Sequence, residues 1–500
     1  MKYSKFFTIK LFIISAALFA SCNASENQAN PQIVTRIPQE IVEIGELSGE
    51  ITILIPGDDS RYNLALQNLQ IYSELFSSIH TDVEIIFETH GSLNDIADQT
   101  ALSLRLMNNP PDIFHTTGSL IWGTEFFEKV NLDALFVDLY DFFYGPRGIN
   151  LEDYFANIFE VAESPEGLFR MPFYVEMEIS FLNRRLFDAI GVDWSAITSL
   201  NIDEEIEYFL RIIDAFPDNS NLWAYRRFSP WDVLLRANLY DLDAGVVTAD
   251  TPVMRLRMEQ AMLAYRQNRQ FMNFMPFAPM PSAYWMSAAR LAPHVLMGQS
   301  PYMRWTSLDS GMTTSTVIMM LAEHPHLQFS QPILTLRGDD NIGFSTRQSF
   351  SIARNSQNTD LAWEFLRFML EFEESLFVSI QESIDPFSEY TNFGWDNLPI
   401  NRARFENQLR AIFEDLYDTI IEFTDLELHI DADGHRAQTL SYVMEFYRGL
   451  MEQADYEIYF NRPVFYSLVY PDFWLLYTNQ QDIATTLANI QNRLELYVAE

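Results

Sequence analysis

Cysteine is almost absent from this chain of 500 residues, in which Cys22 is the only one. A disulfide therefore cannot form within the chain. The sequence also lacks the motifs that mark a Ser or Cys nucleophile, a glycine-rich phosphate loop or a zinc site. It gives no signal for nucleophilic catalysis, nucleotide binding or zinc chemistry.

Basic residues are scarce as well, because 32 Lys and Arg stand against 69 Asp and Glu, a formal net charge of -37. A surface this acidic repels phosphate backbones, so no nucleic-acid partner is expected. Hydrophobic residues still make up 48% of the chain and aromatic residues 14%, which excludes a disordered acidic chain. The roughly 450 residues after position 45 are enough for two lobes with separate cores.

The N-terminus has no acidic residue and no long apolar run. Lys2, Lys5 and Lys10 precede a short apolar stretch at residues 11–19, after which small residues follow. This pattern predicts a secretory signal peptide over residues 1–21. The apolar stretch is too short to span a bilayer, which requires ~20 residues.

Cys22 directly follows Phe-Ala-Ser, and this sequence resembles a bacterial lipobox, in which the thiol is lipidated and becomes the new N-terminus. We therefore expect a lipid anchor at Cys22 and a polar tether over residues 22–45. The alternative is a plain signal peptide followed by an incidental cysteine.

The segment after the tether alternates between strand and helix patterns. Apolar and β-branched runs predict strands at residues 50–55, 82–88 and 112–114, and helical spacing predicts helices over 62–77 and 96–107. This order predicts a parallel sheet wrapped by helices. Ligands of such sheets lie beyond the carboxyl ends of the strands, which nominates Asp58, Asp59, His115 and Thr116. For the two aspartates, helix capping is the alternative.

Helical patterns also mark the rest of the chain. Residues 361–370 are apolar nearly all round and should be buried, and residues 248–265 form a helix entered through Thr251-Pro252. A long acidic helical pattern covers residues 404–460, and a last helix is predicted over residues 482–497.

The order of these segments resembles the extracellular solute-binding proteins of ABC importers, in particular the sugar-binding family that includes maltose-binding protein. The most specific piece is GLFRMPFYVEMEISFLNRRLF at residues 167–187, a turn, an apolar strand and a polar stop before a helix. The likeness covers nearly the whole chain after the tether. Its other segments are ITILIPGDDSRYNLAL, NPPDIF, LMGQSPYMRW, SFSIARNSQNTDLAWEFLRFM and TTLANIQNRLELYVAE.

The resemblance implies an α/β chain with a two-lobed periplasmic-binding-protein-like fold, a hinge and an interlobe cleft. The N-lobe would comprise residues 46–165 plus 344–392. The C-lobe would comprise residues 166–343 plus 393–500, with a helical insertion at 404–461.

The hinge would include the chain crossings at residues 172–179 and 343–349, and Glu176 lies in the first of them. A buried unpaired carboxylate is costly, so Glu176 needs a partner or a cleft to face. The resemblance implies that it contacts the ligand. Glu178 points the same way in a regular strand and could share or take over that role. The alternative for Glu176 is a structural pairing across the hinge.

Aromatic rings pack against the apolar face of a sugar, so they complete the predicted site. Trp305 matches the stacking tryptophan of the family. Four weaker candidates are Trp122, Tyr174, Trp231 and Trp474, for which packing in a core is the alternative.

No metal and no cofactor are expected. The eight histidines are scattered, and the DADG sequence at residues 431–434 has Leu440 where a calcium loop needs Glu.

The predicted protein is a monomeric, lipid-anchored, extracytoplasmic binding protein at the cell surface or in the periplasm. It captures a carbohydrate and delivers it to an ABC permease, and it is not an enzyme. The same scaffold could instead bind a polyamine, a peptide or a metal chelate. A secreted glycosidase would use Glu176 or Glu178 as one of two carboxylates. A sensor lipoprotein would serve a receptor rather than a permease.

Overall fold

The computed structural model describes most of the chain after the predicted tether. Met1–Gly45 forms a unit separate from Glu46–Glu500, and it falls outside the described residues together with the predicted signal peptide and Cys22. The described residues are 47–56, 60–90, 110–116, 132–177, 179–215, 230–237, 239–242, 244–269, 302–305, 329–337, 341–371, 398–423, 432–457 and 463–499.

The first three strands form the predicted parallel sheet. β1 (Ser48–Pro56) lies between β2 (Asp82–His90) and β3 (Ile113–His115), and both pairings are parallel. α2 (Ser60–Ile79) connects β1 to β2. The sheet is therefore the one predicted from the sequence, while the helix predicted at residues 96–107 lies outside the described residues.

α14 (Thr359–Glu371) packs on this sheet and on α2, and it is the helix that the sequence predicted to be buried. Its residues Leu361–Leu366 and Phe368–Leu370 are buried. The Phe76 ring of α2 meets the rings of Phe365 and Phe368 at 5.3 and 5.2 Å between centroids. The apolar pattern all round α14 thus reflects contacts on every side.

A buried carboxylate joins β1 and β3 to the turn before α14. Asp112 Oδ2 accepts a hydrogen bond from the Thr52 amide at 2.8 Å, and the Ser356 hydroxyl donates to Oδ1. Ser356 Oγ accepts from the Asn358 amide at 2.9 Å. Because a buried carboxylate needs donors, the Pro-Asp start of β3 and the Asn-Ser turn form one network.

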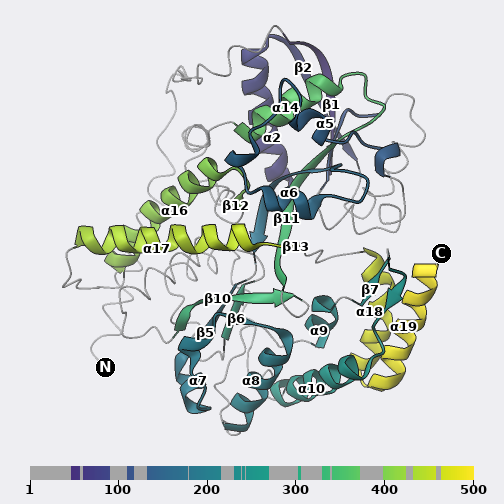
Figure 1. The fold of residues 1–500 in the computed structure, drawn as a ribbon, viewed down its shortest axis with the longest axis vertical. Helices are drawn as coiled ribbons and strands as arrows, with labels where there is room; N and C mark the ends of the chain where they lie inside the picture. The colour runs from purple at the N-terminus through teal and green to yellow at the C-terminus, as the bar shows by residue number, and fades with distance from the viewer. Residues whose placement is uncertain are drawn as a thin grey trace, which may run out of the picture. The chain divides into compact units, whose positions relative to one another are not determined.

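β11 (Asn341–Ile352) is the longest strand among the described residues, and it joins two sets of strands (Figure 1). Its last residues pair with β3, and residues 344–350 pair with β4 (Met171–Met177). Its first two residues pair with β10 (Phe329–Arg337). β10 continues the sheet through β5 (Ile179–Asn183) to β9 (Tyr302–Trp305), in the order β2-β1-β3-β11-β10-β5-β9. One of the two sets therefore consists of β1, β2, β3 and β4, and the other consists of β5, β9 and β10.

The segment at residues 167–187 forms β4, β5 and the start of α7 (Arg184–Ala189), so it contains two strands before the predicted helix where the sequence predicted one. β4 pairs with β11, whereas β5 pairs with β10 and β9, so the chain passes between the two sets of strands here. Gly167 has φ +144° and lies against Asp138, whose Oδ2 would be 2.6 Å from an added Cβ. Asp138 Oδ1 accepts from the Leu168 amide at 3.1 Å, so the turn into β4 requires glycine.

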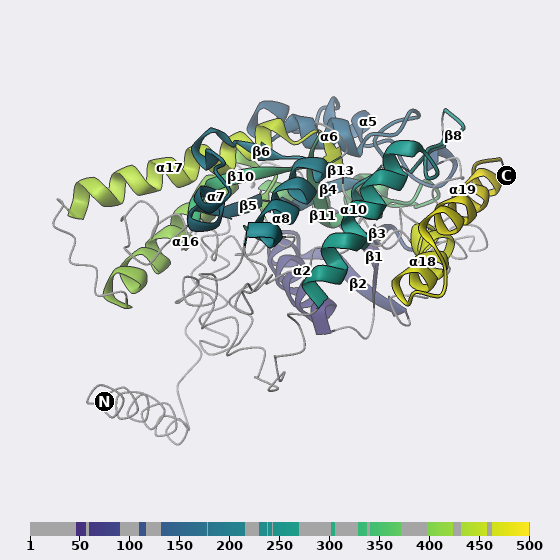
Figure 2. The same cartoon turned by 90° about the horizontal axis from the view of Figure 1, so that it is seen from below.

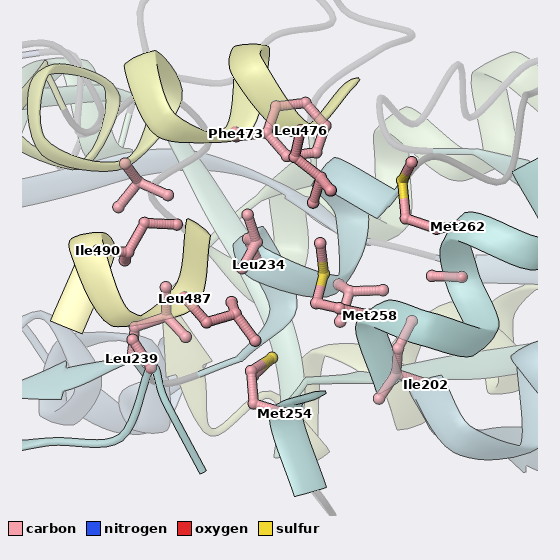
Figure 3. Close-up of a cluster of buried hydrophobic side chains, with 14 of the residues drawn as sticks. Ile202, Leu234, Leu239, Met254, Met258, Met262, Phe473, Leu476, Leu487 and Ile490 are labelled. Atoms are coloured by element: carbon pink, nitrogen blue, oxygen red, sulfur yellow. The ribbon is translucent and has the colours of Figure 1, made fainter. Parts of the chain in front are cut away.

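A second hydrophobic core is built by α8 (Ile202–Ala215), α9 (Pro230–Arg236), α10 (Pro252–Arg269), α18 (Pro463–Tyr477) and α19 (Ile483–Ala499). Figure 3 shows Met254, Met258 and Leu487 meeting in it. α10 begins at Pro252, later than the predicted 248, and Thr251 Oγ1 caps it by accepting from the Met254 amide at 3.2 Å. α19 follows the predicted boundaries closely.

The acidic helical pattern from residue 404 corresponds to α16 (Arg402–Phe423) and α17 (Ala432–Gln453), which pack on each other (Figure 2). β12 (Leu398–Pro399) precedes them and pairs with β4. β13 (Tyr456–Glu457) follows them and pairs with β11. We call residues 398–457 the hairpin segment.

The shorter elements complete the described part of the fold. They are η3 (Leu132–Ala134), α5 (Tyr140–Phe143), η4 (Leu151–Asp153), α6 (Ala156–Ala162), η5 (Trp194–Ala196), β6 (Ser199–Leu200), β7 (Tyr240–Asp241) and β8 (Val246–Val247). Within the described ranges, no helix has both the length and the apolar character needed to cross a membrane.

The second core supplies a stability prediction with a control on the same helix. Leu487 is 0% exposed, whereas Leu496, also on α19, is 67% exposed. Leu487→Ala should lower the free energy of unfolding by about 2–5 kcal/mol because it leaves a cavity, and Leu496→Ala should change it by less than about 0.5 kcal/mol. Urea unfolding of both variants checks this, and equal midpoints would contradict the packing described for α19.

Candidate functional site

Strand register brings two predicted ligand residues to the same region of the sheet. Trp305 of β9 lies opposite Ile179 of β5, and Glu176 of β4 lies opposite Ser345 of β11. Ile179 is the third residue after Glu176 in the chain. The backbone therefore places Glu176 and Trp305 close to the point where the chain passes from β4 to β5.

Four of the predicted ligand residues lie outside the described residues. They are Asp58, Asp59, Trp122 and Glu178. Their contact with a ligand, like lipidation of Cys22, stays a prediction.

His115 is the last residue of β3 and Thr116 follows it, and both are buried against β11. The Thr116 amide donates to the Ser349 carbonyl at 2.7 Å, and the two hydroxyls lie 3.0 Å apart. The Ser349 hydroxyl also lies close enough to donate to the Thr116 carbonyl. In the structure these two candidates form part of the packing between β3 and β11, and ligand contact by either of them stays a prediction.

Burial governs the charge state of His115. Its ring packs on Phe350 at 4.9 Å between centroids, and neither ring nitrogen has a hydrogen-bond partner among the described residues. Desolvation lowers the pKa of His115 from 6.5 to about 4. The imidazole is therefore neutral at pH 7.

Tyr174 of β4 contacts the hairpin segment. Its hydroxyl accepts a hydrogen bond from Arg404 Nη2 at 2.7 Å, and the Arg404 guanidinium carbon lies 5.6 Å from the centroid of its ring. These contacts give Tyr174 a structural role, while its predicted contact with a ligand is untested.

Arg404 connects four segments, and no sequence pattern had marked it. From α16 it donates to the carbonyls of Met369 and Leu370 at 2.6 and 3.2 Å, in the last turn of α14. It also donates to the hydroxyl of Tyr72 on α2 at 3.1 Å. A cation suits a helix C-terminus, where carbonyls lack partners within the helix and the dipole is negative. The only available signal was its position next to the apolar stripe of α16.

Trp231 and Trp474 belong to one aromatic cluster. Trp231 of α9 packs on Phe473 and Tyr470 of α18, at 4.9 and 5.4 Å between centroids. Trp474 is 46% exposed and stacks on Tyr470 and Tyr477, at 6.1 and 5.6 Å. Trp231 thus packs against the second core, and Trp474 is an exposed member of the aromatic cluster.

A buried ion pair lies at the start of β4. Arg170 Nη1 donates to Glu457 Oε1 at 2.7 Å, and Nη2 contacts Oε2, so the pair is bidentate. Both residues are 4% exposed. Arg170 lies in the sequence GLFRMPF, but its charge had not been singled out there. Arg236 of α9 and Glu205 of α8 form a second buried pair in the other core.

The described residues contain no group of three His, Cys, Asp or Glu side chains arranged to hold a metal ion. The absence of a metal and of a cofactor stays a prediction, because several acidic and histidine residues lie outside those ranges.

Comparison with solved structures identifies the fold. A periplasmic-binding protein from Synechococcus sp. MITs9220, for which an oligosaccharide ligand has been suggested, matches 90% of this chain and 99% of its own with 13% identity and a TM-score of 0.54. Its complex with zinc matches the same shares at 13% identity, with a TM-score of 0.50. The GacH receptor of Streptomyces glaucescens GLA.O, studied with acarbose, matches 91% and 100% at 13% identity, with a TM-score of 0.49.

No protein-family model and no curated protein sequence matches the chain. The chain has the mixed α/β fold of the periplasmic-binding proteins, which confirms the predicted fold class. The two Synechococcus structures, which resemble it over nine-tenths of its length, are of a periplasmic-binding protein, in line with the sequence resemblance.

Arg404 yields a prediction about stability. Arg404→Ala leaves two helix carbonyls and two tyrosine hydroxyls without their donor, and should lower the free energy of unfolding by about 3 kcal/mol. Arg448→Ala removes an exposed pair with Glu406 on the same hairpin and should cost about 0–1 kcal/mol. Urea unfolding compares the two variants, and a similar small loss for both would refute the role of Arg404.

His115 yields a prediction about pH. Its pKa is lower in the folded chain than its usual value, so the unfolded chain binds more protons between pH 6.5 and about 4. Its contribution to stability is full above pH 6.5 and falls as the pH drops toward 4, by at most about 3 kcal/mol. His115→Leu should remove this dependence. The measurement is urea unfolding from pH 7 to pH 4.5, and parallel curves for the two proteins would rule out a buried neutral His115.

Proposed function

We propose that this chain is an extracytoplasmic substrate-binding protein of an ABC importer, which captures a mono- or oligosaccharide and passes it to a permease. The observation that carries the proposal is the periplasmic-binding-protein fold over 90% of the chain. The protein from Synechococcus that shares this fold is one for which an oligosaccharide ligand has been suggested, which supports the choice of ligand.

The proposed site lies where the chain crosses between the two sets of strands. β4 and β5 carry Glu176 and Ile179, and Trp305 lies opposite Ile179. A carboxylate accepts hydrogen bonds from sugar hydroxyls, and an indole packs on the apolar face of the ring. Glu176 and Trp305 thus supply the two kinds of contact that a sugar requires. Asp58 and Glu178 are proposed to add further acceptors.

The proposed cycle is a hinge motion between an N-lobe (46–165 and 344–392) and a C-lobe (166–343 and 393–500). The crossings at residues 172–179 and 343–349 would bend, and a ligand held by both lobes would favour the closed state. The ligand shifts this equilibrium only by its difference in affinity for the two states. No bond is made or broken in this cycle.

The remaining parts of the proposal concern location. Residues 1–21 would be removed as a signal peptide, and lipidated Cys22 would hold the protein at the membrane through the tether 22–45. One acyl chain gives marginal membrane binding, so stable anchoring requires more than one chain. Because the chain is strongly acidic, anionic lipids do not attract it electrostatically. The lipid anchor alone would therefore hold the protein at the membrane.

A thermal-shift screen of mono- and oligosaccharides tests the ligand class, with spermidine and peptides as comparisons. A sugar at 100 times its Kd should stabilise the fold by about 3 kcal/mol without being consumed. Trp305→Ala should weaken binding of that sugar by about tenfold through loss of ring packing, whereas Tyr144→Ala, at a side chain 75% exposed, should not change it.

The outcomes of this screen separate the alternatives. A shift with spermidine and with no sugar would replace the carbohydrate by a polyamine. Release of product from a glycoside, abolished by Glu176→Gln, would show a glycosidase instead of a binding protein. Unchanged affinity in Trp305→Ala would remove Trp305 from the site.

A further inference from the structure

We propose that Arg170 and Glu457 are a positioning pair, through which the hairpin segment holds the two crossing strands β4 and β11 in a fixed position and orientation relative to each other. The inference rests on the proposed function in one respect: these strands include the crossings assigned to the hinge. It gives a role to a segment that the sequence marked only as an acidic helical insertion.

The hairpin segment is attached to both crossing strands, one at each of its ends. At its first end, Leu398 and Pro399 of β12 lie opposite Val175 and Tyr174 of β4. At its other end, β13 pairs in parallel with β11. The hairpin segment therefore extends the sheet at the two strands on which the chain crosses.

Polar contacts reinforce the second attachment. Asp455 Oδ1 accepts from the Ile342 amide at 2.6 Å, and the Asp455 amide donates to the Ile342 carbonyl at 3.1 Å. Asn157 of α6 donates to the carbonyls of Met451 and Ala454, both at 2.8 Å. The end of α17 and the start of β13 are thus held to β11 and to α6.

The ion pair links positions that lie apart along β11. Glu457 pairs beside Phe344, whereas Arg170 leads directly into Met171, which lies opposite Phe350. A bidentate contact between guanidinium and carboxylate fixes both distance and orientation. The pair therefore constrains how β11 and β4 run between these positions, which a contact within one strand pair would not do.

The burial of this pair makes its loss costly. Removing one partner of a buried ion pair strongly destabilises the structure around the other charge. The pair between Arg236 and Glu205 has the same chemistry and similar burial, but it joins α8 to α9 in the second core. It is a matched control, because its loss costs stability without touching β4 or β11.

The experiment compares Glu457→Gln with Glu205→Gln in the purified full chain without ligand. Hydrogen exchange is measured on residues 171–177 and 341–349, together with solution X-ray scattering. Glu457→Gln should speed exchange in these strands by roughly tenfold or more and should broaden the distribution of interatomic distances. Glu205→Gln should lower the melting temperature to a similar extent and change neither readout.

Two outcomes would overturn the proposal. One is unchanged exchange and scattering in Glu457→Gln, and the other is an equal change in both variants. If Glu457→Gln does not fold, Arg170→Lys replaces it, because it keeps the positive charge beside Glu457 and removes the bidentate contact, with the same exchange and scattering changes expected. None of these measurements needs a ligand, so the two proposals can fail independently. A failed carbohydrate screen would reject the proposed carbohydrate function, whereas only the exchange and scattering data decide this inference.

Discussion

The pairing of strand β11 is the constraint on which the rest of this structure depends. Backbone amides and carbonyls that are removed from water must be paired, and β11 does so in turn with β10, β13, β4 and β3. β3, β4 and β13 lie far from β11 in sequence, whereas β10 closely precedes it. Because one strand takes part in both sets of pairings, the parallel sheet of β1, β2 and β3 becomes continuous with β5, β9 and β10.

Buried polar groups add specificity to this framework. Asp112 ties β1 and β3 to the turn before α14, and Arg404 ties α16 to α14, α2 and β4. Arg170 and Glu457 tie the start of β4 to β13. Each group would be costly to bury alone, so each is stable only in the arrangement that provides its partners.

Local patterns sufficed where the structure depends on neighbouring residues. Thr251 and Pro252 mark the start of α10 because capping and a fixed φ act within one turn. The apolar pattern of α14 predicts that the helix is buried but does not predict which elements cover it. For the site, sequence order and the likeness to a family nominated Glu176 and Trp305, and strand register is consistent with their lying close together. Other candidates have structural contacts, such as Tyr174 with Arg404 and Trp231 with Phe473, and their contact with a ligand stays a prediction.

The amino-acid sequence by itself determined the alternation of strands and helices, the fold class and the acidic character of this protein. The alternation and the acidic character follow from periodicity, capping and composition, which are local or summed over the chain, whereas the fold class was predicted from the resemblance to a known family. The tertiary structure alone decided that Arg170 meets Glu457, 287 positions away, and that β12 and β13 attach the acidic helices to β4 and β11. The residues next to a charge or a two-residue strand in the sequence do not indicate its partner, because that partner is determined by the long-range packing of the chain.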